Sequence, residues 1–174
     1  MTREQLEHLI RAAAALTGED ELLVMGTQAV LGQFANAPLA MKTALYADLV
    51  PKERPEKAPV IEKALGEGSS FHQVWGYFAR GTDPRKAILP AGWQGRLIPI
   101  LSPGTRGSVG WTLELYDLLV SEYAAGRENA RPFAREALQT LADRDTLLRR
   151  LAKAGLEEKR RNEIAEKIRA DGAG

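Results

Sequence analysis

Residues 23–30, Leu-Val-Met-Gly-Thr-Gln-Ala-Val, form an apolar run that ends at a glycine, meets a hydroxyl and resumes in residues suited to a helix. The run predicts a buried strand and a helix that begins at once. Such a turn can present backbone N–H groups and the Thr27 hydroxyl to an anion at a helix N-terminus, where the helix dipole favours negative charge. The alternative is an ordinary strand-to-helix turn, in which Gly26 supplies permissive backbone angles and Thr27 caps the helix.

Composition excludes several kinds of site. Of the 174 residues, 44% are hydrophobic and 27% are charged, and the formal net charge is +1. These values predict a globular domain with its own core, and they give no overall reason to expect a nucleic-acid binder. The chain has no cysteine, which excludes disulfides, thiolate metal sites and cysteine nucleophiles. Its two histidines, His8 and His72, are too few for a histidine-rich metal site.

Hydropathy predicts a cytoplasmic protein without a membrane partner. No apolar run approaches the roughly 20 residues that span a bilayer. The first residues, Met1 to Gln5, contain no apolar signal core.

Periodicity, proline and glycine positions predict the order of the elements. A first helix is capped by Thr2 with Gln5 in capping-box spacing, and Gly18 ends it. Strands are predicted at residues 21–25, 43–50, 76–80, 96–100 and 110–113. Further helices are predicted at residues 27–34, 59–65, 117–125, 132–141, 145–153 and 156–169.

This order predicts an α+β fold with a mixed sheet. Residues 1–115 are expected to form the α/β core, and residues 116–174 a helical region packed on it that ends in a charged helix or tail. In the strand predicted at 43–50, alternation places Tyr46, Asp48 and Val50 on one face.

The turn and the strand after it resemble the opening signature of the nucleotidyltransferase superfamily of the DNA polymerase β type. Gly26-Thr27 closes a strand, and Ala47-Asp48-Leu49 follows about 20 residues later on a neighbouring strand. In that superfamily a Gly-Ser turn precedes a strand with two carboxylates one residue apart. Such carboxylates hold metal ions that bridge the triphosphate and activate a hydroxyl.

An ordered set of further segments resembles the DUF6036 family of small bacterial nucleotidyltransferase-like proteins, which is similar to the AbiEii-type toxins of toxin–antitoxin and phage-defence systems. The resemblance runs from about residue 2 to residue 153. The segments that carry it are residues 25–34, 47–51, 66–72, 89–93 with Arg96-Leu97, 113–118 and 124–128.

The resemblance implies a metal-dependent nucleotidyltransferase that transfers a nucleoside monophosphate from an NTP to an RNA or protein acceptor. Asp48 would hold Mg²⁺ and act in catalysis together with Asp117. Gly26, Thr27 and Arg127 would bind the phosphates of the nucleotide. A cognate toxin or antitoxin protein, or a second copy in a homodimer, is an implied partner.

The chain also departs from the family pattern. Tyr46 stands where the first carboxylate is expected, and Thr27 replaces the serine after the glycine. Glu122 stands where the family carries a lysine, and the Arg-x-Lys-Asp element reads Arg127-Glu128-Asn129-Ala130. Phosphoryl transfer depends on positioning and electrostatic stabilisation, so these losses weaken catalysis. The alternative function is a catalytically degenerate homologue that binds a nucleotide or a protein partner.

Structural explanations compete for each candidate residue. Asp48 is also consistent with a solvated aspartate at a strand end, and Asp117 with an acid that stabilises the dipole of its helix. Arg127 is also consistent with a salt bridge to Glu122 or Glu128. Glu67 is a candidate replacement for the missing carboxylate.

Overall fold

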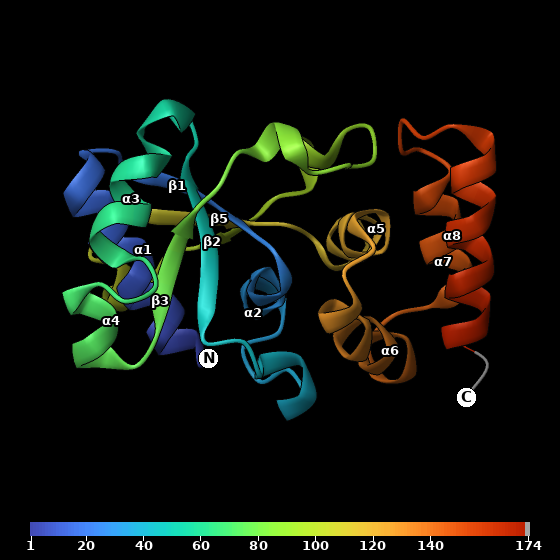
Figure 1. Ribbon diagram of the computed structural model, residues 1–174, viewed down its shortest axis with the longest axis horizontal. Coiled ribbons are helices and arrows are strands. Elements are labelled where there is room, and N and C mark those ends of the chain that lie inside the picture. The colour runs from blue at the N-terminus through green and yellow to red at the C-terminus, as the bar shows by residue number, and fades with distance from the viewer. Residues whose placement is uncertain (173–174) are drawn as a thin grey trace.

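A five-stranded mixed sheet forms the centre of the computed structural model, which describes residues 1–172 (Figure 1). The strands lie in the order β3-β2-β1-β5-β4. Their bounds are β1 Glu21–Met25, β2 Tyr46–Pro51, β3 Phe78–Gly81, β4 Ile98–Ile100 and β5 Val109–Thr112. All five predicted strands are therefore present, and the predicted α+β class with a mixed sheet is confirmed.

Strand β1 occupies the middle of the sheet. It pairs antiparallel with β2 and parallel with β5, while β2 and β3 run parallel and β4 and β5 antiparallel. Four of the five β1 side chains, from Leu22 to Met25, are buried. The continuous apolar run therefore reflects a strand that is covered on both faces.

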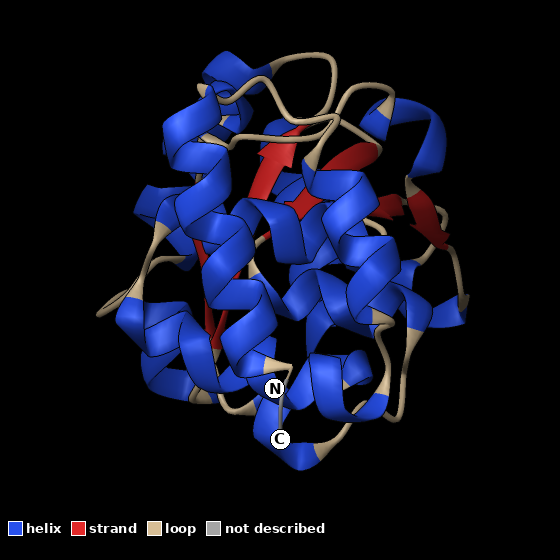
Figure 2. Ribbon diagram, turned by 90° about the vertical axis from the view of Figure 1, so that its right-hand side faces the viewer, coloured by secondary structure: helices blue, strands red, loops and turns tan. Residues whose placement is uncertain are grey.

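Helices cover both faces of the sheet (Figures 1 and 2). Helices α1, α3 and α4 lie on one side, α2 and α5 lie on the other, and α7 with α8 forms an outer pair farthest from the strands (Figure 1). The helix bounds are α1 Arg3–Thr17, α2 Val30–Gln33, α3 Ala58–Leu65, α4 Ser70–Trp75, α5 Leu115–Ala125, α6 Arg131–Thr140, α7 Arg144–Leu151 and α8 Glu158–Asp171.

The predicted caps of α1 are confirmed. Thr2 accepts a hydrogen bond from the backbone N–H of Gln5, and the Gln5 side chain accepts one from the backbone N–H of Thr2. Gly18 ends the helix in the left-handed conformation with φ 69°. Local side-chain chemistry alone determines both ends, so the sequence is sufficient to locate them.

Two differences from the predicted elements concern β2 and the segment before β3. Strand β2 begins at Tyr46 rather than at residue 43, and the side chain of Leu45 is 55% exposed. Helix α4 was not predicted, because six residues are too few to establish a helical period. Ser69 caps its start and Gly76 ends it with φ 73°, which delays β3 to Phe78.

The charged C-terminal segment is a docked helix rather than a free tail. Helix α8 buries Ile164, Ala165 and Ile168 against the body of the protein. At its end the carboxylate of Asp171, 4% exposed, accepts hydrogen bonds from the Tyr123 hydroxyl and from Arg135. None of the helices in the described part of the chain is long and apolar enough to cross a membrane.

Candidate functional site

The Gly26–Thr27 turn lies directly against the carboxylate of Asp48. Strand pairing places Met25 beside Asp48, so the turn that follows β1 passes over this side chain. Gly26 has φ 67° and ψ −178°, and a Cβ atom there would lie 2.4 Å from Asp48 Oδ2. Only glycine permits both this backbone conformation and this close approach.

Arg80 forms a bidentate ion pair with Asp48 from the neighbouring strand. The two residues are direct partners in the parallel β2–β3 pairing. Arg80 Nε donates to Asp48 Oδ1 at 2.8 Å, and Arg80 Nη2 donates to Oδ2 at 3.0 Å. The guanidinium also stacks over the ring of Tyr46, 3.9 Å from its centroid. Asp48 is 8% exposed, so its carboxylate is bound by Arg80 and is not solvated.

Arg80 is not among the site residues predicted from the sequence, although the sequence contains a signal for it. Tyr46-Ala47-Asp48 and Phe78-Ala79-Arg80 have the same pattern of aromatic, alanine and charged residues. Because alternate side chains share a face, the parallel pairing of these segments aligns aromatic with aromatic and acid with base.

Glu122 and Arg127 form a second ion pair at the C-terminal end of α5. Arg127 Nη2 donates to both carboxylate oxygens of Glu122 at 2.8 Å. Burial raises the pKa of Glu122, and the hydrogen bond and charge of Arg127 only partly oppose this effect. The negative charge of Asp48 raises the pKa of Glu122 further. The salt bridge that the sequence offered as an alternative role for Arg127 is therefore formed.

Asp48, Glu122 and Arg127 line two cavities. The larger cavity has a volume of about 480 Å³, and the smaller one about 170 Å³. The other residues lining the larger cavity are Thr27, Ala40, Met41, Thr43, Ala44, Tyr46, Asn129, Ala130, Pro132 and Phe133. The other residues lining the smaller cavity are Met25, Gly26, Thr82, Asp83, Lys86, Ala87, Ile88, Ser121, Ala124 and Ala125. Four predicted site residues, Gly26, Thr27, Asp48 and Arg127, are thus brought together.

Asp117 lies apart from this group. It is fully buried in the first turn of α5 and lines neither cavity. Arg96 donates to both of its carboxylate oxygens, at 2.8 and 2.9 Å, and Arg150 donates to Oδ1 at 2.6 Å. Asp117 is thus held between two arginines, outside the candidate site.

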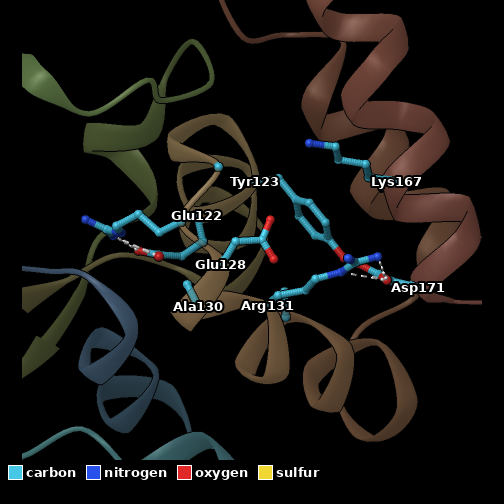
Figure 3. A pocket seen from close by; sticks show the side chains of 10 residues that line it. Glu122, Tyr123, Glu128, Ala130, Arg131, Lys167 and Asp171 are labelled. Carbon is cyan, nitrogen blue, oxygen red and sulfur yellow. Dashed lines mark hydrogen bonds and ion pairs between the residues drawn. The ribbon is translucent and has the colours of Figure 1, made fainter.

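Glu67 and Arg131 also lie outside the candidate site. Glu67 is exposed in the turn before α4 and lines neither cavity. Arg131 contacts Asp171, with Nη2 3.1 Å from Oδ1. Figure 3 draws a pocket that both Glu122 and Arg131 line, in which Tyr123 faces Asp171 and α8. Glu122, the residue before Tyr123 on α5, is instead paired with Arg127.

The arrangement does not fit the Mg²⁺ ion that the resemblance implies. Proteins usually bind Mg²⁺ through one or two carboxylates together with substrate phosphates, and Asp48 and Glu122 are carboxylates of this kind. However, all four of their oxygens accept hydrogen bonds from guanidinium groups. Within residues 1–172, no group of three or more His, Asp or Glu side chains is placed to hold a metal ion. The negative charges of Asp48 and Glu122 are compensated by Arg80 and Arg127.

Replacing Arg80 with alanine should destabilise the protein, because it leaves the buried Asp48 carboxylate without donors. We expect the free energy of unfolding to fall by about 1–3 kcal/mol, measured by urea denaturation. Arg85→Ala is the matched control, since Arg85 also forms a bidentate pair with an aspartate, Asp83, but is 88% exposed. It should cause no measurable change. Equal losses of unfolding free energy in Arg80→Ala and Arg85→Ala would contradict a stabilising ion pair between Arg80 and Asp48.

Comparisons with known protein families, with curated proteins and with solved structures find no match to this chain. The geometry of the two ion pairs and the two cavities therefore carries the functional argument.

Proposed function

We propose that this chain is a nucleotidyltransferase-like protein that binds a nucleotide without a metal ion and without transferring it. The observation that supports this proposal best is the bidentate pair of Arg80 with Asp48. In this pair both oxygens of Asp48, the expected metal ligand, accept hydrogen bonds from Arg80. The Gly26–Thr27 turn, the expected phosphate-binding element, is present beside them.

The larger cavity has the chemical character that a nucleotide requires. Its volume of about 480 Å³ lies within the ordinary range for small-molecule sites. One part of the lining is apolar, with Met41, Pro132 and Phe133, and suits a base. The other part carries Thr27 and Arg127, whose hydroxyl and guanidinium suit phosphate oxygens.

Nucleotidyl transfer is the second candidate function, because one observation favours it. Glu122 supplies a second carboxylate beside Asp48, in the same two cavities, although no carboxylate stands at residue 46. Transfer would require both arginines to leave these acids. The proposal of binding alone requires no rearrangement of the Asp48–Arg80 pair.

Calorimetric titration with ATP, GTP, CTP and UTP, each in EDTA and in excess Mg²⁺, tests the proposal. We expect at least one nucleotide to bind with an affinity that Mg²⁺ does not increase. Arg127→Ala should weaken that binding by about 10- to 100-fold, because a charge-assisted hydrogen bond to phosphate contributes about 1.5–3 kcal/mol.

Arg149→Ala is the matched control for charge. Arg149 is exposed on α7, lines neither cavity and, within the described part of the chain, hydrogen-bonds only to Thr146, so its loss should leave the affinity unchanged. Absence of binding for all four nucleotides would refute the proposed function. Binding that requires Mg²⁺ and is lost in Asp48→Asn would instead support nucleotidyl transfer.

A further inference from the structure

The candidate site contains two acids and two bases, and this balance restricts how it can bind an anion. Asp48 is paired with Arg80 and Glu122 with Arg127, so the four side chains carry no net charge. A phosphate group brings negative charge and needs a cation whose donors are available. A phosphate in this site would therefore compete with one of the two carboxylates for its guanidinium.

The geometry favours exchange at Arg127. Arg80 is fixed by two separate nitrogens on Asp48 and by the ring of Tyr46 beneath it. Arg127 reaches Glu122 through Nη2 alone, and its side chain is 47% exposed. Arg127 also follows Gly126, the left-handed residue that ends α5, and so lies beyond the last turn of the helix. Arg127 can therefore leave Glu122 by breaking the contacts of a single nitrogen, and its side chain already reaches solvent.

We propose that a ligand phosphate displaces Glu122 from Arg127, and that Glu122 takes up one proton from the solvent as the ligand binds. The proposal rests on the proposed function, because it assigns the partner of Arg127 in the same cavity. No covalent bond to the ligand forms or breaks. An O–H bond forms on the Glu122 carboxylate, and bulk water or buffer supplies the proton.

Burial explains why Glu122 would take a proton instead of remaining a free carboxylate. Its side chain is 2% exposed, and among residues 1–172 the only cation that hydrogen-bonds to it is Arg127. An unpaired buried carboxylate is costly, and such groups become neutral at pH values at which exposed ones are charged. Burial already raises the pKa of Glu122 while Arg127 is in place, so removal of Arg127 raises it further.

The other charged and titratable groups near Glu122 do not reverse this direction. Asp48 on β2 raises the pKa of Glu122 and Arg80 on β3 lowers it, and these two are paired with each other. The remaining titratable groups of the two cavities are Tyr46 on β2 and Asp83 and Lys86 beside β3. Glu122 and Arg127 also line a third pocket, drawn in Figure 3, whose other titratable groups are Tyr123 on α5, Glu128 before α6, Arg131 on α6, and Lys167 and Asp171 on α8. Asp83 is compensated by Arg85, and Asp171 by Arg131 and Arg135.

The proposal predicts that nucleotide affinity falls as pH rises. Binding that takes up one proton weakens by about tenfold per pH unit above the pKa of Glu122 in the free protein. Glu122→Gln places a permanently neutral side chain at residue 122 and leaves Arg127 without its carboxylate partner. The affinity of this variant for ATP should therefore not fall with rising pH in this way. At pH 8 we expect Glu122→Gln to bind ATP at least about tenfold more tightly than the wild type.

Proton uptake can be counted directly by calorimetry. ATP is titrated in EDTA into the full chain at pH 6.5, 7.25 and 8.0, at each pH in two buffers of different ionisation enthalpy. Protons that ATP itself gains appear equally in the wild type and in Glu122→Gln, so the difference between them belongs to Glu122. We expect that difference to approach one proton at pH 8.

The outcomes separate the two proposals. ATP binding in the wild type with no proton uptake at pH 8, and with a pH-independent affinity, would overturn the exchange at Arg127 and leave nucleotide binding intact. No binding at any pH, in either protein, would refute the proposed function itself. If Glu122→Gln does not fold, the proton count of the wild type at pH 8, where free ATP is already ionised, still decides the question.

Discussion

Replacing Asp117 with alanine is expected to lower the free energy of unfolding by about 3–5 kcal/mol, the usual loss when one partner of a buried ion pair is removed. Asp117 is fully buried and receives three hydrogen bonds from Arg96 and Arg150. The side chains of these arginines are only 27% and 18% exposed, so water compensates them poorly. A loss of this size is a large fraction of the stability of an ordinary domain, about 5–15 kcal/mol.

Urea denaturation followed by circular dichroism measures this loss. Asp145→Ala is a suitable control, because Asp145 is also an aspartate in the first turn of a helix, but its side chain is 69% exposed. We expect no measurable change there. Nucleotide binding by folded Asp117→Ala should match that of the wild type. A stable Asp117→Ala variant that had lost binding would show that Asp117 belongs to the functional site.

Replacing Gly26 with alanine is expected to have the second largest effect, a loss of about 3 kcal/mol or more. Two costs combine in this variant. The backbone region at φ 67° and ψ −178° is nearly closed to residues other than glycine, at a cost of about 1–3 kcal/mol. The new methyl group would also lie 2.4 Å from Asp48 Oδ2 and force that carboxylate away from Arg80.

Gly18→Ala separates these two costs. Gly18 also has a positive φ, 69°, but apart from atoms of its own local backbone and chain neighbours, no atom of the described residues lies within 4 Å of the position that its Cβ would occupy. We expect a loss of about 1 kcal/mol, from backbone strain alone. Urea denaturation compares the two variants. Similar losses of unfolding free energy in Gly26→Ala and Gly18→Ala would mean that a methyl group at residue 26 does not clash with Asp48.

The sequence predicted the class of the fold and the number of strands because those properties depend on local patterns. The Thr2–Gln5 capping box and the Gly18 cap are visible within a few residues. Strand β1 was equally clear as a short apolar run between turns. Helix α4 was missed because its ends are set by Ser69 and Gly76, and its six residues show no period of their own.

Only part of the candidate site could be predicted from the sequence, because some of its residues meet through long-range packing. Gly26 and Thr27 form the turn after β1 and Asp48 lies on the neighbouring strand β2, so both the turn and the strand can be recognised from local sequence. Arg80 became a site residue through the register of β2 with β3, and Glu122 through the packing of α5 on the sheet. Asp117 looked similar to Asp48 in the sequence. Only the approach of Arg96 and Arg150 from distant segments distinguishes their roles.

The order of strands has a consequence for synthesis on the ribosome. The central strand β1 pairs with β2 soon after it is made, but its other edge awaits β5, where Glu21 pairs with Val109. At typical translation rates that delay is roughly 5–20 s. During this time an apolar strand edge is open to pairing with another chain, so a nascent chain that stops before β5 is the species most exposed to aggregation and to chaperone binding.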